Sequence, residues 1–338
     1  MEFFGFTLFG SLSGGALLAV AAVIFVVGLI LTIKGGDWFV DSASWFAEAT
    51  GIPKFVVGAT VVSFATTLPE LLVSVRAAMN GSAQLAIGNA VGSVTANTTL
   101  IMGVSLVAMA GLVNRKSFSL KGGLLLASIV GLTLLSLSGW LPTWSAFVLW
   151  AIFLVFMISN LIEGKKGAAN DEIDSYEKKE LPSKIFFFII GTASIVFGAE
   201  FLVSSGKTIA SGIGISETII GFTVIALGTS LPELVTTLTA IRKKEASLSV
   251  GNIIGANIID TTLILPLCAV INGTALPVEK INLGFDFPIC IAACAVATIP
   301  TIIMGKFKKW QGFALLGIYA AYMALLVLNE TGIVVLGA

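Results

Sequence analysis

Two glutamates occupy matching positions in the two halves of this very apolar chain. Glu70 ends the segment SFATTLPE, and Glu233 ends the segment ALGTSLPE. An ionisable side chain in hydrocarbon costs about 2.5–3.5 kcal/mol on insertion scales, so it needs a function or a partner. Each glutamate follows a proline, which has no N–H and clashes with the carbonyl four residues earlier. We therefore expect helix breaks near Thr66–Thr67 and Thr229–Ser230, with free carbonyl oxygens beside the carboxylates.

The oxygen-rich set formed by the glutamates and the broken helices suits a hard cation. Carboxylate, hydroxyl and carbonyl oxygens are ligands for Ca²⁺, Mg²⁺, Mn²⁺ or Na⁺, whereas soft metals prefer sulfur or imidazole. The chain has no histidine, which excludes imidazole ligands. Two carboxylates would neutralise one divalent ion and so offset the cost of burying them. Each glutamate could instead have a purely structural role, as a hydrogen-bond partner of a neighbouring helix. This alternative does not explain why the same proline and hydroxyl residues precede both glutamates.

The next predicted helix of each half carries residues spaced by four, which share a helix face. The first set is Asn89, Ser93 and Asn97, and the second is Asn252, Ala256 and Asp260. We expect the polar members to line a cavity beside the glutamates, with Asp260 as a third carboxylate where the first half has an amide. A single interhelical hydrogen bond is the alternative role for Asp260. The glycines of the same GN-x-x-G motifs have small-xxx-small spacing, which indicates close helix packing.

These motifs belong to an internal repeat. Residues 58–100 and 221–263 align without gaps at an offset of 163, with 17 identities in 43 positions. Apolar composition alone would not produce a shared Pro-Glu and a shared Gly-Asn. The self-similarity indicates that the two halves have the same fold.

Membrane-spanning helices are the elements predicted to position the motifs. The chain is 57% hydrophobic and 11% charged, whereas soluble proteins have about 45–50% apolar and about 25% charged residues. A span needs about 20 predominantly apolar residues. The pattern predicts ten, at 16–48, 53–79, 84–110, 119–139, 143–163, 184–211, 216–241, 247–271, 284–304 and 311–330. The expected fold is an all-α membrane protein with ten transmembrane helices.

The ten helices divide into a first repeat at 1–162, a charged linker at 163–184 and a second repeat at 185–338. Because each repeat has an odd number of spans, equivalent helices enter the membrane from opposite sides. The repeats are therefore expected to be inverted about an axis in the membrane plane, which would bring the two helix breaks together near mid-membrane.

Lysine and arginine in short loops predict the orientation in the membrane. With ten spans, the main basic clusters fall on the linker side, so the linker is expected to be cytoplasmic and both termini outside. These clusters are Arg115/Lys116/Lys121, the linker lysines, Arg242/Lys243/Lys244 and Lys306/Lys308/Lys309.

Charge and cysteine content narrow the classes of partner and site further. The net charge is zero, so nothing indicates a nucleic-acid partner. The three cysteines, Cys268, Cys290 and Cys294, lie in apolar segments without a Cys-x-x-Cys motif and are interpreted as packing residues.

The paired motifs resemble a known family. GATVVSFATTLPE and GFTVIALGTSLPE, followed by GNAVGSVTAN and GNIIGANIID, are similar to the two alpha-repeats of the cation/calcium antiporter superfamily, closest to the prokaryotic sodium/calcium exchangers. The resemblance implies a secondary active antiporter that exchanges Ca²⁺ for Na⁺ by alternating access, with helices one and six sliding across the other helices. It also implies a multi-pass protein of the plasma (inner) membrane of a prokaryote. Its partners would be the two transported ions and the lipid bilayer, with no cofactor.

The resemblance further implies roles for individual residues. Glu70 and Glu233 would be the central calcium ligands, completed by the carbonyls of Thr66 and Thr229. The flanking sodium or water sites would be formed by Thr67, Ser230, Ser63, Ala226, Ser93, Asn97 and Asp260.

Two departures from the family pattern concern the coupling ion. Thr67 stands where serine is frequent and keeps the hydroxyl, but Ala256 stands where a serine is usual and lacks the oxygen of one expected sodium site. The GN-x-x-E pattern typical of proton-coupled relatives is absent. Sodium is therefore favoured over protons, with an H⁺-coupled antiporter for Ca²⁺ or another divalent ion as the alternative.

Two other classes are less consistent with the residues. An intramembrane enzyme would need a nucleophile and base, or metal-activated water, and this set cannot be assembled without histidine. An ion channel needs a continuous pore, typically formed by rings of carbonyls or charges in an oligomer, rather than a buried acidic pair in one chain. Because one chain carries both repeats, a monomer would suffice, although the sequence leaves the oligomeric state open.

Overall fold

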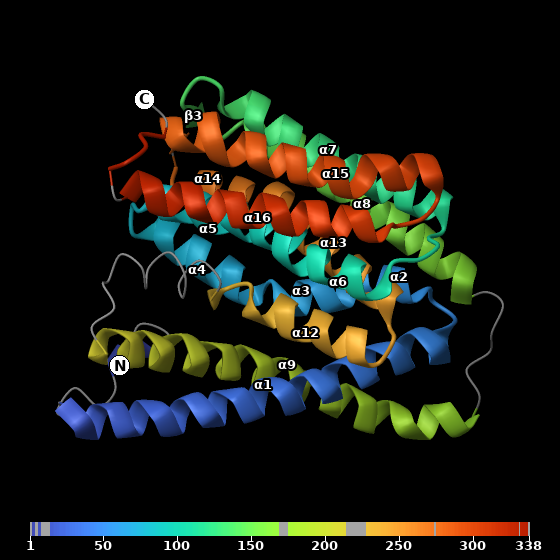
Figure 1. Ribbon diagram of the computed structural model, residues 1–338. Helices are drawn as coiled ribbons and strands as arrows, with labels where there is room; N and C mark the ends of the chain where they lie inside the picture. Colours follow the sequence, from blue (N-terminus) through green and yellow to red (C-terminus); the bar gives the residue numbers. More distant parts are fainter. Residues whose placement is uncertain are drawn as a thin grey trace.

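The computed structural model describes residues 2–3, 6–7, 14–168, 175–213, 228–273, 275–330 and 332–336 (Figure 1). Its long elements are helices that lie side by side. In the first half they are α1 (Gly14–Thr50), α2 (Lys54–Val57), η1 (Gly58–Val62), α3 (Ser63–Thr66), α4 (Leu68–Met79), α5 (Ala83–Ala96), η2 (Asn97–Ile101), α6 (Met102–Met109), α7 (Arg115–Ser136) and α8 (Ser145–Ala168). In the second half they are α9 (Ser175–Gly212), α12 (Leu231–Arg242), α13 (Ala246–Ile259), η4 (Asp260–Ile264), α14 (Leu265–Ile271), η5 (Asn282–Asp286), α15 (Phe287–Met304) and α16 (Lys309–Glu330).

Short antiparallel strand pairs complete the described elements. The strand β1 (Glu2–Phe3) pairs with β2 (Phe6–Thr7), and β3 (Trp140–Leu141) pairs with β4 (Leu276–Pro277). The second pair joins the connection after α7 to the connection after α14, so it ties the two halves of the chain together at one end of the helices.

The membrane-protein fold class is confirmed. Within the described residues, eight helices are long and apolar enough to cross a membrane, and a bent pair formed by Lys54–Thr66 and Leu68–Met79 makes nine. These nine match nine of the ten predicted spans. The remaining one, predicted at 216–241, overlaps residues 214–227, which lie outside the described residues, and only its end is seen as α12. The count of ten therefore stays a prediction.

The backbone repeats with the same offset as the sequence. The helices α4 and α12, α5 and α13, and η2 and η4 have bounds that each differ by 163 residues. The first helices of the two halves, α1 and α9, run in opposite directions (Figure 1), as inverted repeats require.

The spans built on α5 and α13 form the centre of the molecule. The apolar windows of Gln84–Met109 and Ala246–Ile271 are 78% and 83% buried, whereas those of the other long helices are 17–39% buried. The long helices α1 and α9 lie together on one side of this centre, and α7, α8, α15 and α16 lie on the other (Figure 1). The two spans that carry the GN-x-x-G motifs are thus enclosed by the other long helices.

Glycine allows α1 and α9 to touch backbone to backbone. A Cβ on Gly35 would lie 2.6 Å from the Ser194 Cβ and 2.9 Å from the Gly191 carbonyl oxygen. Conversely, a Cβ on Gly191 would lie 2.8 Å from the Phe39 backbone nitrogen. Small residues permit this close approach in membrane helices, so the two helices form one closely packed pair.

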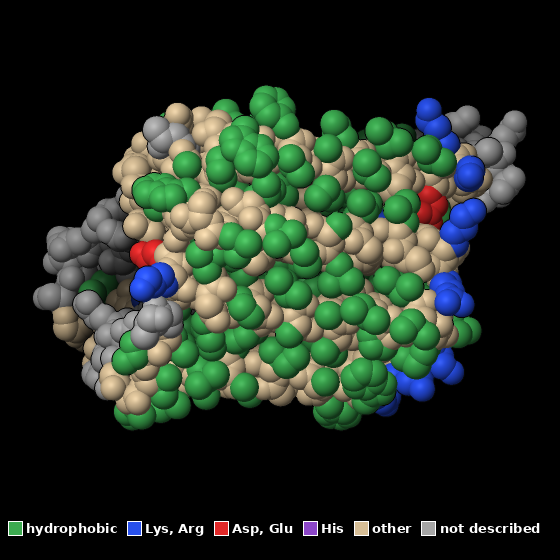
Figure 2. Space-filling model, turned by 90° about the horizontal axis from the view of Figure 1, so that it is seen from above, with side chains coloured by type: hydrophobic (Ala, Val, Ile, Leu, Met, Phe, Trp, Pro, Cys, Tyr) green, Lys and Arg blue, Asp and Glu red, His purple; other side chains and the backbone are tan. Residues whose placement is uncertain are grey.

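The surface has the charge distribution of a membrane protein. Figure 2 shows hydrophobic side chains over the middle of the molecule and most Lys and Arg side chains at one end. Figure 1 places the end of α8 and the start of α9 at that same end. The basic end is therefore the linker end, as the loop charges predict.

The charged linker is more helical than expected. The helix α8 continues to Ala168 and α9 already begins at Ser175, so both reach into the predicted 163–184 linker. Residues 169–174 lie outside the described residues. Lysine, glutamate and alanine are good helix formers, which explains why the solvated ends of these spans continue as helix.

The buried cysteines have the predicted packing role. Cys268, Cys290 and Cys294 are each 0% exposed and form no disulfide. All three belong to the main hydrophobic core.

The GN-x-x-G motif of the second half packs against the first half. A Cβ on Gly251 would overlap the Phe55 carbonyl oxygen and lie 3.1 Å from the Ala59 nitrogen. We therefore expect Gly251→Ala to lower the apparent melting temperature in detergent, because forced overpacking typically costs about 1–3 kcal/mol. Gly123→Ala on α7 is the matched control, since its added methyl would have no neighbour within 4 Å. Equal melting temperatures for the two variants would contradict the packing.

Candidate functional site

The predicted helix break of the first half is present, and the equivalent residue of the second half has matching backbone angles. The chain bends by 47° between Lys54–Thr66 and Leu68–Met79. Thr67, at the bend, has φ −84° and ψ 2°, and its counterpart Ser230 has φ −85° and ψ 5°. In both halves the next helix resumes with proline in its first turn. Proline is favoured in the first turn of a helix, where its missing N–H is not needed. The new helix can therefore begin at Leu-Pro-Glu, directly after Thr67 or Ser230.

The two glutamates are buried just after these breaks. Glu70 is 1% exposed and Glu233 is 0% exposed. Both carboxylate oxygens of Glu70, and Oε2 of Glu233, have no hydrogen-bond partner among the described residues. The Thr67 hydroxyl donates to the Ser63 carbonyl at 2.6 Å and lies 3.3 Å from Glu233 Oε1. The break of the first half thus contacts the carboxylate of the second.

A third carboxylate lies in the same electrostatic environment. The charges of Glu233 and Asp260 both repel the Glu70 carboxylate, and Glu233 repels Asp260. Asp260 begins the π-helix η4, and its repeat counterpart Asn97 begins the π-helix η2. Single π-helical turns are frequent at functional sites because they re-aim side chains within a helix.

Most unpartnered buried polar atoms are concentrated here. Among the described residues, fourteen buried side-chain nitrogen or oxygen atoms have no hydrogen-bond partner. Ten of them belong to Glu70, Asn97, Ser230, Glu233, Asn252, Asn257 and Asp260. Buried polar groups are normally hydrogen-bonded, and concentrated exceptions indicate bound water or an ion. The arrangement is therefore suited to a cation.

The donor set is not a cluster of acidic side chains alone. Within the described part of the chain, no group of three or more Asp, Glu, Cys or His side chains is close enough to hold one metal ion. A cation here would have to be completed by hydroxyl, amide and carbonyl oxygens. Such mixed oxygen shells are typical of Ca²⁺ sites.

Most of the other predicted site residues that the structure describes are buried. Ser63, Thr66, Thr67, Ser93 and Ser230 are each 0–2% exposed. The Ser63 hydroxyl donates to the Thr60 carbonyl at 3.0 Å, and the hydroxyls of Ser93 and Thr229 lie 3.4 Å apart. The structure thus brings residues of both repeats together. Ala226 lies outside the described residues.

One buried amide beside Asp260 was not anticipated. Asn257 is 0% exposed, its Nδ2 donates to Thr98 Oγ1 at 2.8 Å, and its Oδ1 has no partner among the described residues. It does not belong to the stripe of residues spaced by four on α13. Its side chain instead reaches η2 of the first repeat, a contact that helical spacing within one repeat does not reveal.

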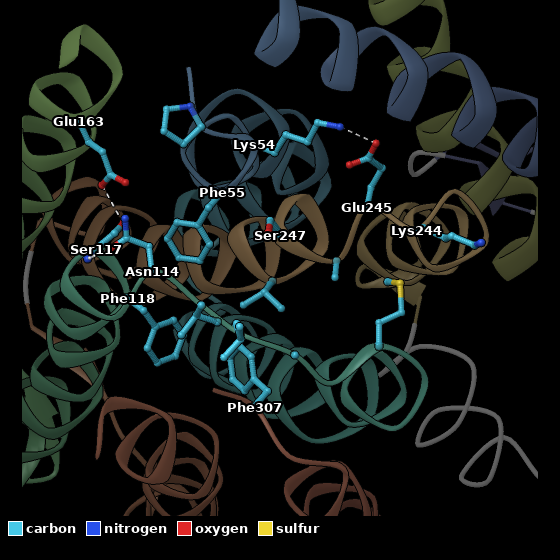
Figure 3. Close-up of a pocket in the computed structure, with 17 residues that line it drawn as sticks. Lys54, Phe55, Asn114, Ser117, Phe118, Glu163, Lys244, Glu245, Ser247 and Phe307 are labelled. Carbon is cyan, nitrogen blue, oxygen red and sulfur yellow. Dashed lines mark hydrogen bonds and ion pairs between the residues drawn. The ribbon is translucent and has the colours of Figure 1, made fainter. Parts of the chain in front are cut away.

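A separate cavity lies away from these residues. It has a volume of about 430 Å³ and none of the predicted site residues lines it. Figure 3 shows that Lys54 points to Glu245 and that Ser117 bonds Glu163 at its rim. Each of these carboxylates also pairs with a lysine, Glu245 with Lys54 at 2.7 Å and Glu163 with Lys121 at 2.8 Å. Because both carboxylates are already paired, the cavity is a weaker candidate for a cation site.

Ion pairs also join α1 to the end of α12. Asp37 pairs with Arg242 and, at 3.8 Å, with Lys243. Lys243 also pairs with Asp41 at 2.7 Å. These acidic residues of α1 are therefore partners of the basic cluster at the linker end rather than part of the buried acidic site.

Comparison with protein families supports the assignment suggested by the motifs. The family described as sodium/calcium exchanger protein matches residues 20–161 and 183–328 of this chain. The chain belongs to the sodium/calcium exchanger family. The two matched segments lie on either side of the predicted charged linker and leave out almost all of it.

Relatives of this family member match three quarters or more of its length. The sodium/calcium exchanger MaX1 of Methanosarcina acetivorans is 31% identical over 92% of this chain and 99% of its own length. An inner membrane protein of Escherichia coli, YrbG, is 34% identical over 75% of this chain and 81% of its own. The solved structure of the sodium-calcium exchanger NCX_Mj, soaked with Na⁺ and Sr²⁺, has a TM-score of 0.80 at 29% identity and covers 91% of this chain and 99% of its own.

Proposed function

We propose that this protein is a secondary active antiporter that exchanges Ca²⁺ for Na⁺ by alternating access. The observation that carries the proposal is the pair of buried glutamates at two symmetry-related helix breaks, with Thr67 of one repeat beside Glu233 of the other. The solved relative NCX_Mj, with the same fold, is a sodium-calcium exchanger. Binding sites at the interface of inverted repeats are typical of secondary transporters.

The proposed calcium ligands are the carboxylates of Glu70 and Glu233 with the carbonyls of Thr66 and Thr229. The two carboxylates neutralise one Ca²⁺, and without a cation their charges repel each other. Flanking sodium or water sites would use Thr67, Ser230, Ser63, Ala226, Ser93, Asn97 and Asp260. Because the flanking sodium sites would overlap the central calcium site, binding of one ion excludes the other, which is the requirement for exchange.

Sodium is the coupling ion that the relatives favour. MaX1 and NCX_Mj are both sodium/calcium exchangers. An H⁺-coupled antiporter therefore has less support. In the same proposal the linker end faces the cytoplasm, because that end carries most of the basic side chains, and the α1–α9 pair slides as one unit.

Reconstitution into proteoliposomes tests the proposed exchange. Vesicles loaded with Na⁺ and diluted into Na⁺-free medium should take up ⁴⁵Ca²⁺, whereas vesicles loaded with K⁺ or an acidic buffer should not. Uptake should stop when the sodium gradient is collapsed. Uptake driven equally by a pH gradient would replace Na⁺ by H⁺ as coupling ion, and flux without any counter-ion would contradict an antiporter.

Ala256 provides a test of the sodium sites. It is 0% exposed on α13 and occupies the repeat position of Ser93. We expect Ala256→Ser to lower the Na⁺ concentration that half-saturates exchange by about twofold to tenfold. This range corresponds to the free energy of one added contact that is as strong as a hydrogen bond. The measurement is the Na⁺ dependence of ⁴⁵Ca²⁺ uptake. An unchanged half-saturating concentration would make this a packing position.

A further inference from the structure

The asparagines of the two GN-x-x-G motifs reach across the molecule to the opposite repeat. Asn89 on α5 accepts a hydrogen bond at its Oδ1 from the Thr229 hydroxyl, at 3.2 Å. Asn252 on α13 accepts one at its Oδ1 from the Thr66 hydroxyl, at 3.1 Å. Both bonds therefore run crosswise, from the helix of one half to the helix break of the other.

Asn89 also holds the helix that carries the glutamate of its own half. Its Nδ2 donates to the Glu70 carbonyl at 3.3 Å and to the Ser74 hydroxyl at 2.9 Å. One side chain thus links the backbone of Glu70 to Thr229. A shift of either helix break would change the geometry of this link.

The second asparagine is less restrained. Asn252 is 0% exposed, and its Nδ2 has no hydrogen-bond partner among the described residues. Thr237, the repeat counterpart of Ser74, instead accepts a hydrogen bond from Ser249 at 3.4 Å. Asn252 therefore fixes Thr66 but not the helix that carries Glu233.

The direction of these bonds determines what each threonine offers to a cation. A hydroxyl has one proton and two acceptor lone pairs. When the threonine donates that proton to the asparagine side-chain oxygen, its hydroxyl oxygen has only lone pairs left to offer to a cation. The asparagine thus prevents the hydroxyl proton from pointing at a positive ion, and it also fixes the threonine whose backbone carbonyl lies at the break.

We propose that Asn89 and Asn252 are positioning residues that lock the two helix breaks to each other in the ion-binding geometry. They act through Thr229 and Thr66 rather than by touching the ion. The proposal rests on the proposed exchange function. It means that each half of the site is shaped by a side chain from the other repeat, so the two halves bind the ion as one unit.

Double-mutant cycles test these crosswise links. The bonded cycles combine Asn252→Ala with Thr66→Val, and Asn89→Ala with Thr229→Val. The control cycles combine the same substitutions the other way, Asn252→Ala with Thr229→Val and Asn89→Ala with Thr66→Val. The measurements are KM for Ca²⁺ and the maximal rate of Na⁺-driven uptake, together with calorimetric Ca²⁺ binding to the purified protein.

We expect each single substitution to raise KM for Ca²⁺ by about fivefold, as the loss of one ordinary hydrogen bond predicts. In the bonded cycles the second substitution should add little, whereas in the control cycles the two effects should multiply. Asn160→Ala removes a buried asparagine on α8 whose hydrogen bond among the described residues stays within its own helix, so it should leave KM unchanged. The melting temperature of every variant shows whether it is folded.

The outcomes separate the two proposals. Wild-type exchange with equal coupling in bonded and control cycles would overturn the positioning role alone. Asn160→Ala with the same rise in KM would overturn it as well, because the effect would then follow from lost stability. A wild-type protein that neither binds nor exchanges Ca²⁺ would overturn the proposed function and the positioning role together.

Discussion

Glu70→Gln and Glu233→Gln should each abolish Na⁺-driven ⁴⁵Ca²⁺ uptake without unfolding the protein. Glutamine keeps the shape and size of the side chain but removes the charge that neutralises half of a divalent ion. The carboxylates are buried and have few hydrogen-bond partners among the described residues, so little folding energy depends on their charge. Removing it also relieves the repulsion between them, and the melting temperature in Ca²⁺-free buffer should stay constant or rise.

Glu48→Gln is the matched control for these variants. Its side chain is 64% exposed and pairs with Lys54 at the linker end of α1. It should therefore transport calcium at the wild-type rate. Robust exchange by the Glu70 or Glu233 variant, or equal loss in all three, would contradict the assignment of the two buried glutamates as ion ligands.

Glu163→Gln should be strongly destabilising although it lies outside the proposed ion site. Its carboxylate is the ion-pair partner of Lys121 on α7, at 2.8 Å, and the Lys121 side chain is 0% exposed. The ammonium group also lies 4.7 Å from the centre of the Phe55 ring. Removing one partner of a buried pair leaves an uncompensated charge and can cost up to about 3–5 kcal/mol. The change is measured as the apparent melting temperature or the denaturant midpoint in detergent.

The double variant Lys121→Met/Glu163→Gln identifies the source of that loss. Methionine preserves much of the volume of the lysine stem and carries no charge, and apolar replacement of buried ion pairs is often neutral. We expect the double variant to recover most of the stability lost by Glu163→Gln. If both variants were equally unstable, packing of Glu163 rather than the buried charge would be responsible.

The sequence predicts the helix break of the candidate site well because local chemistry determines it. The proline before Glu70 must disturb the helix wherever that helix packs, and the bend at Thr67 confirms this. The repeat then assigns the same geometry to Ser230, whose backbone angles match within a few degrees. Neither inference needs knowledge of how distant helices pack.

Contacts between distant helices could not be predicted in the same way. The bond from Thr66 to Asn252 joins residues 186 positions apart, and it depends on how α13 is rotated against α3. The charge pattern groups Lys121 with a basic loop cluster, yet its side chain is buried against Phe55 and Glu163. Such details follow from tertiary packing, which can override what residue type and hydropathy suggest.

The matched backbones of the two repeats have a consequence for the resting state of the molecule. When inverted repeats rock past each other, each half adopts the conformation that the other half had before. A chain with identical halves would therefore populate outward-open and inward-open forms equally. Equivalent helices of the two repeats have matching bounds here, but their side chains differ. Ala256 occupies the position equivalent to Ser93, and Asp260 occupies the position equivalent to Asn97. These side-chain differences remove the symmetry that would otherwise make the two forms equal in free energy.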